Sequence, residues 1–91
     1  MPSKYSLETV AGLLEQHRQR ASYPALSALI GVRPQILIRG LPREPRHSWI
    51  VDARTGRPTK FPEDQIAPDL AQHPRILQTV TELVAWLDSI R

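Results

Sequence analysis

Apolar residues recur at three- and four-residue spacing near both ends of the chain, which is the spacing of one face of an α-helix. The first stripe predicts a helix that begins after Ser6, a favourable N-cap, and ends near Arg20. The second predicts a helix over residues 74–90, opened by Pro74, with its apolar stripe at Ile76, Leu77, Val80, Leu83, Val84, Leu87 and Ile90.

Two shorter apolar segments lie between these helices, and each has a start and a stop signal. Ser22, followed by a proline, predicts the start of a helix over residues 23–30, and Gly31 is a typical residue after a helix end. The next segment, residues 35–39, lies between Pro34 and Gly40. Its three consecutive apolar residues also suit a buried strand, but the flanking proline and glycine favour a helix.

A helix, a turn that contains glycine and a second helix at this spacing form a helix-turn-helix. Its inner face is expected to consist of Leu26, Ile30, Val32 and Leu37. Such helix pairs are moderately specific for nucleic-acid binding, because they also occur in folds that bind other partners.

The pattern changes after residue 40, where prolines predict a loop over residues 41–46. Residues 48–52 favour a strand, Thr55 and Gly56 a tight turn, and residues 58–61 a return strand that Pro58 restricts to an edge. Within the first strand, Trp49 is expected to anchor the core rather than to stack on a ligand. Residues 62–74 contain three prolines and predict an irregular segment with at most one helical turn, near Gln65.

The whole pattern predicts a single domain over residues 1–91, mainly α with a small β-hairpin, similar to a winged helix-turn-helix. A chain of 91 residues buries only a modest share of its surface, so most large apolar residues are needed for one core.

Positive charge is concentrated in the middle of the chain. The net charge is +3, and residues 33–60 hold seven basic and two acidic residues, whereas the rest holds five basic and seven acidic ones. This asymmetry predicts a basic surface on one side of the domain. The residues expected to contact phosphates are Arg33, Arg39, Arg43, Arg46, Arg54, Arg57 and Lys60, and Gln35 is the polar candidate for a base edge.

Candidate catalytic chemistry is sparse. The chain has no cysteine, which excludes disulfides and thiolate chemistry and is compatible with a reducing cytoplasm. His47, Ser48 and Asp52 lie too close in sequence to form the aligned triad of a hydrolase. Three well-separated histidines predict no metal site, no cofactor is implied, and no apolar run approaches the roughly 20 residues of a membrane span. We therefore expect a protein that is not an enzyme.

Residues 22–61 resemble the winged helix-turn-helix domain of the O6-alkylguanine DNA alkyltransferases and their catalytically inactive alkyltransferase-like relatives. The resemblance rests on Ser-Tyr-Pro-Ala-Leu-Ser-Ala-Leu-Ile-Gly (residues 22–31), Arg39-Gly40, Arg43-Glu44-Pro45, and Ile50-Val51 before Thr55-Gly56. It implies that Tyr23 lies near the DNA backbone and that residues 34–39 form a recognition helix that enters the minor groove.

The same alignment places His47 where the family has its alkyl-accepting cysteine, so alkyl transfer by the family mechanism is excluded. Leu37 stands at the position of the arginine that props open the duplex. The function expected from the sequence is non-enzymatic DNA binding through the helix-turn-helix and a basic wing. The alternative is a protein-interaction module that presents the same basic surface to an acidic partner.

Overall fold

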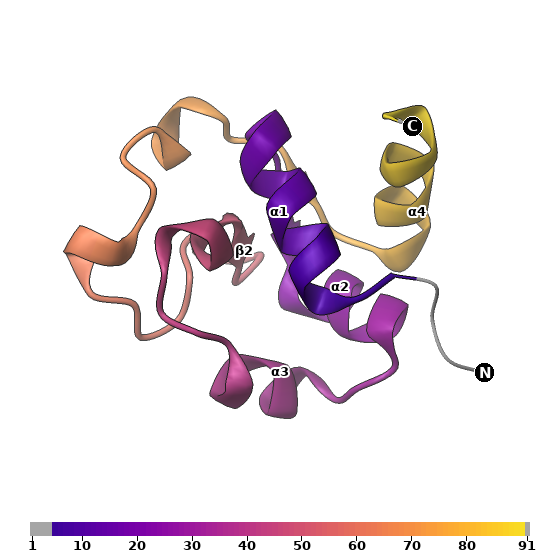
Figure 1. Ribbon diagram of the computed structural model, residues 1–91, viewed down its shortest axis with the longest axis horizontal. Helices are drawn as coiled ribbons and strands as arrows, with labels where there is room; N and C mark the ends of the chain where they lie inside the picture. Colours follow the sequence, from indigo (N-terminus) through magenta and orange to yellow (C-terminus); the bar gives the residue numbers. More distant parts are fainter. Residues whose placement is uncertain (1–4, 91) are drawn as a thin grey trace.

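The computed structural model describes residues 5–90, and its helices pack around a small sheet (Figure 1). The α-helices are α1 (Leu7–His17), α2 (Tyr23–Ile30), α3 (Pro34–Gly40) and α4 (Val80–Ser89). The strands are β1 (Arg20–Ser22), β2 (Ile50–Val51) and β3 (Ile76–Leu77), and the 3-10 helices are η1 (Pro45–Trp49), η2 (Glu63–Gln65) and η3 (Leu70–Gln72). A mainly α fold with a small β component is therefore confirmed.

The three strands form one parallel sheet in the order β2-β1-β3. β1 is the central strand, with Ala21 opposite both Ile50 of β2 and Leu77 of β3. All three residues of β1 are buried. The sequence pattern did not predict this strand, because three residues between two helices are too short to show a period.

The predicted β-hairpin was wrong in its second strand. Its turn forms, since the Asp52 N–H donates to the Arg57 carbonyl at 3.0 Å and the Gly56 N–H donates to the Asp52 carbonyl at 2.7 Å. Residues 58–61 then leave the extended conformation, with Lys60 at a φ of 59°. Pro58 has no N–H to donate to a strand ladder. β2 instead pairs with β1 in parallel, so the described residues contain no antiparallel wing.

The two N-terminal helices begin as predicted. The Ser6 side chain accepts a hydrogen bond from the Thr9 N–H at 3.1 Å, and the Ser22 side chain accepts one from the Ala25 N–H at 3.2 Å. α2 ends at Gly31, whose φ of 81° is the left-handed conformation that glycine adopts without strain. α3 forms as a helix rather than as a strand.

The last helix begins at Val80, six residues later than predicted. Thr79 is its N-cap and accepts from the Glu82 N–H at 3.1 Å, while the Glu82 carboxylate accepts from the Gln78 N–H at 3.3 Å. The Thr-x-x-Glu spacing of a capping box was present in the sequence, and Glu82 accepts here from the residue before the N-cap. Residues 76 and 77, which were assigned to the helical stripe, belong to β3 because they complete the sheet beside β1.

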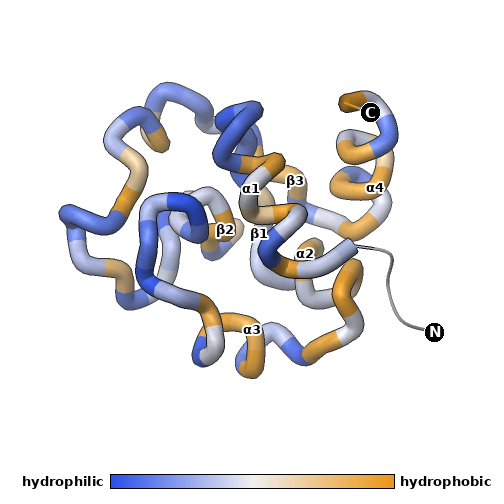
Figure 2. The backbone as a smooth tube through the Cα atoms, viewed as in Figure 1, coloured by the Kyte–Doolittle hydropathy of each residue, from blue (hydrophilic) through white to orange (hydrophobic). Residues whose placement is uncertain are grey.

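The core lies between the sheet, α1, α2 and α4. Trp49 is fully buried in it, as predicted. α4 packs mainly on α2, and it meets α1 through an edge-on contact between the Trp86 and His17 rings, whose centroids are 5.7 Å apart. α3 lies at the edge of the molecule and contributes one buried side chain, Leu37 (Figures 1 and 2). None of the helices in residues 5–90 is long and apolar enough to cross a bilayer.

Candidate nucleic-acid interface

One face of α3, together with the turn before it, points into solvent. We call this face the α3 surface and define it as Val32, Arg33, Gln35, Ile36 and Arg39, all of which are exposed. Ile36 is 59% exposed and Val32 is 38% exposed, and they are the exposed large apolar residues among those described. The prediction that Val32 lies on the inner face was wrong, because α2 ends at Ile30 and Val32 lies in the exposed turn before α3.

The turn that follows β2 lies beside α3. A hollow of about 330 Å³ is lined by Tyr23 and Pro24 of α2, Pro34 and Ile38 of α3, and residues 52–54 of the turn. Arg54 therefore lies next to α3, and its N–H donates to the Asp52 carboxylate at 2.8 Å. The structure thus places Arg54 close to Pro34 and Ile38 of α3, although they are far apart in the sequence.

Four of the predicted phosphate contacts have no ion-pair partner within residues 5–90. They are Arg33, Arg39, Arg54 and Lys60, and all four side chains are exposed. The segment from residue 31 to residue 40 contains no acidic residue, and Asp52 is the acidic residue that lines the neighbouring hollow. The α3 surface is therefore a region of net positive charge.

Arg46 and Arg57 were also predicted to contact phosphates, but each forms an ion pair with acidic residues of the protein itself, at its surface. Arg46 lies 3.6 Å from the Glu8 carboxylate and 4.0 Å from that of Glu15, both on α1. Arg57 donates to the Glu63 carboxylate at 2.5 Å. Because a carboxylate already lies beside each of these cations, a phosphate has to displace it, whereas the four unpaired cations offer no such competition.

Arg43 and Tyr23 also have internal partners. Arg43 donates to the Leu41 carbonyl, and its guanidinium lies over the Phe61 ring at 5.4 Å. Tyr23 is buried, and its hydroxyl accepts a hydrogen bond from the Thr59 N–H at 2.7 Å. Tyr23 therefore holds the 52–60 segment against α2, an interaction that the sequence pattern did not indicate.

The His47 and Ser48 side chains are both buried and make separate contacts. His47 Nε2 lies 3.1 Å from the Glu8 carboxylate. The Ser48 hydroxyl donates to the Pro45 carbonyl at 2.6 Å and accepts from the Ala67 N–H at 2.9 Å. They form no nucleophile–base pair with each other, and residues 5–90 hold no cluster of three residues suited to a metal ion.

Arg20 is a candidate site residue that the sequence pattern missed. It was expected at a fraying helix end, but it lies in the central strand and is 9% exposed. Its Nη1 donates to the Gly56 carbonyl at 2.8 Å, and its Nε and Nη2 donate to the Leu70 carbonyl at 3.2 and 2.5 Å. Burial lowers the pKa of Arg20 from its ordinary value, because removal from water disfavours the charged form.

Comparison of the chain with models of protein families, with curated protein sequences and with solved structures finds no match.

Proposed function

We propose that this protein binds duplex DNA without catalysis, through the α3 surface together with Arg54 and Lys60. The main support is the distribution of ion pairs: the cations of this surface have no described acidic partner, whereas Arg46 and Arg57 elsewhere do. Unpaired, exposed arginines on one face are what phosphate binding requires. A chain without cysteine that acts on DNA also suits a reducing cytoplasm.

In this proposal, α3 acts as the recognition helix of the α2–α3 pair. Arg33 at its start and Arg39 near its end would contact the phosphates, and Gln35 would reach a base edge. The exposed Ile36 lies between them in sequence and suits a minor groove, where apolar side chains insert between base steps. The resemblance to the alkyltransferase-like winged helix-turn-helix, whose recognition helix enters that groove, points the same way.

The proposal differs from the sequence-based expectation in two respects: it does not use a wing, and it leaves out Tyr23, Arg43 and Arg46, which have internal partners. The return strand is absent, and Arg57 is paired with Glu63. Arg54 takes the place of the wing because the turn, rather than a full hairpin, lies beside α3.

A salt series of fluorescence anisotropy titrations on unrelated duplexes tests this proposal. Replacement of Arg33, Arg39 and Arg54 by alanine should weaken binding to all duplexes and lower the slope of log affinity against log salt by up to about 2.7. The matched control replaces Arg18, Arg46 and Arg57, three exposed arginines that pair with acidic residues. The control has the same net charge and should keep most of the slope, whereas equal losses in both variants would contradict the proposal.

A second candidate function, binding of an acidic protein segment, is favoured by the exposure of Ile36 and Val32. Apolar side chains surrounded by arginines suit a partner that combines an apolar anchor with carboxylates. If the wild-type protein binds no duplex even at low salt, the DNA proposal fails and this candidate replaces it. Ile36→Ser would then abolish binding of an acidic amphipathic peptide without a change in stability.

A further inference from the structure

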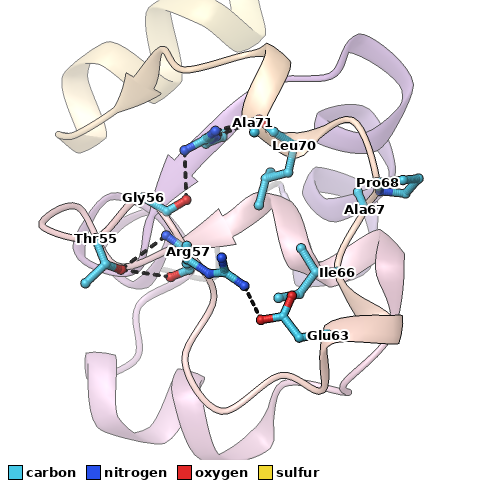
Figure 3. Close-up of a pocket in the computed structure, with 10 residues that line it drawn as sticks. Thr55, Gly56, Arg57, Glu63, Ile66, Ala67, Pro68, Leu70 and Ala71 are labelled. Carbon is cyan, nitrogen blue, oxygen red and sulfur yellow. Dashed lines mark hydrogen bonds and ion pairs between the residues drawn. The ribbon is translucent and has the colours of Figure 1, made fainter.

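A second feature, separate from the α3 surface, is a cavity of about 400 Å³ between the turn at residues 52–57 and the η2–η3 segment. Figure 3 shows Thr55, Gly56 and Arg57 on one side and Ile66, Pro68 and Leu70 on the other. Arg20 also lines this cavity, from the central strand. The cavity thus combines two arginines with an apolar wall.

The hydrogen bonds of Arg20 leave part of its donor capacity unused. A guanidinium has five N–H groups, and Arg20 uses one on each of its three nitrogens, toward Gly56 and Leu70. One N–H on each terminal nitrogen therefore has no partner within residues 5–90, and Arg20 forms no ion pair with a described carboxylate. It is a nine-tenths buried cation with no counter-ion among residues 5–90.

Buried charges in proteins are normally paired, because an uncompensated charge out of water is costly. The two carbonyl oxygens stabilise the guanidinium of Arg20 but carry no net charge. Space for an anion exists beside it, since Arg20 lines the cavity. Arg57 adds a second cation, and its pairing with the 83% exposed side chain of Glu63 is easily exchanged.

We propose that this cavity binds a small organic anion, whose carboxylate or phosphate group pairs with Arg20 and Arg57. Its apolar body would lie against Ile66 and Leu70. The volume suits a ligand of metabolite size. In this arrangement Glu63 competes with the ligand for Arg57, and Gly56 allows the close approach of Arg20, because a Cβ there would lie 2.7 Å from Nη1.

An NMR titration of the full chain at constant ionic strength tests the proposal. The probes are hexanoate and phenyl phosphate, which carry an apolar body, with acetate, inorganic phosphate and chloride for comparison. We expect saturable shifts at the amides of Gly56, Leu70 and Ala71, with tighter binding of the two larger anions. Whichever of these two anions binds more tightly shows whether the cavity prefers a carboxylate or a phosphate group. Shifts that fail to saturate by about 10 mM, or that spread over the α3 surface, would overturn the proposal.

Substitutions at three exposed residues test binding without disturbing the folded core. Arg57→Gln should weaken binding of the tighter-binding anion about 10- to 100-fold through loss of a charge-assisted hydrogen bond. Arg54→Gln, in the same turn but outside the cavity lining, should leave its affinity unchanged. Glu63→Gln should tighten binding about two- to fivefold, because it frees Arg57. Equal effects of the two arginine substitutions would reject the site, and duplex affinity measured on the same variants reports separately on the α3 surface.

Discussion

Arg20 and Arg39 are the same residue type in one small domain, yet they differ in burial and in the hydrogen bonds of their guanidinium groups. Arg20 lies in the central strand, is 9% exposed and joins two loops through their carbonyl oxygens. Arg39 lies on the outer face of α3, exposed and without a described ion-pair partner. Removal of the first should affect folding, and removal of the second should affect binding.

Apolar residues of the core and of the α3 surface also differ in burial, and the largest effect on stability is expected for a buried one. Leu83 of α4 is fully buried, so Leu83→Ala should lower the free energy of unfolding by about 2–5 kcal/mol through lost burial and a cavity. Ile36→Ala on the α3 surface should change it by less than about 0.5 kcal/mol. Urea unfolding measures both values. A comparable loss at Ile36 would show that the α3 surface is part of the core.

The next largest effect is expected for Arg20→Leu, which should lower the free energy of unfolding by about 2–4 kcal/mol. The substitution keeps an apolar side chain of similar reach but leaves the Gly56 and Leu70 carbonyl oxygens without their buried donor. Arg39→Leu is the matched control and should be nearly neutral for stability. Thermal and urea unfolding of the pair measure the contrast, and an unchanged Arg20→Leu variant would mean that water replaces the guanidinium.

Gly56→Ala should lower the free energy of unfolding by about 1–3 kcal/mol. Its φ of 72° is unfavourable for any residue with a Cβ, and the new Cβ would approach Arg20 Nη1 to 2.7 Å. Gly12 is the control, because a Cβ there meets nothing within 4 Å and the residue lies inside α1. Gly12→Ala should stabilise the protein by about 0.5–1 kcal/mol, and a stabilising Gly56→Ala would contradict the observed turn.

The smallest effect on stability is expected for the arginines of the α3 surface. Arg33→Ala and Arg39→Ala should each change the free energy of unfolding by less than about 0.5 kcal/mol, since neither side chain has a described partner to lose. Each should nevertheless lower the salt dependence of duplex binding by about 0.9. Unfolding and anisotropy on the same samples check both parts, and a variant that loses stability but keeps its salt dependence would reverse the comparison.

The sequence pattern was most informative where the structure depends on residues that are close in sequence. Ser6 and Ser22 cap their helices, Gly31 ends α2 and Pro34 starts α3, as predicted, because each acts through a turn of its own chain. The N-cap at Thr79, followed three residues later by Glu82, obeys the same local rule and would have corrected the start of α4. Arg33, Gln35 and Arg39 were selected from the sequence by their charge and polarity, and all three are exposed in the structure.

By itself, then, the sequence determined the helices, their caps and the excess of positive charge in the middle of the chain. Only the tertiary structure decided how the strands pair and which arginines remain unpaired. β2 lies beside β1 rather than beside residues 58–61 because pairing depends on segments far apart in the chain. Likewise, Arg57 is neutralised by Glu63 and Arg46 by acidic residues of α1, whereas Arg39 is not. Charge is a property of each residue, but whether it is available depends on what folding places within a few ångströms of it.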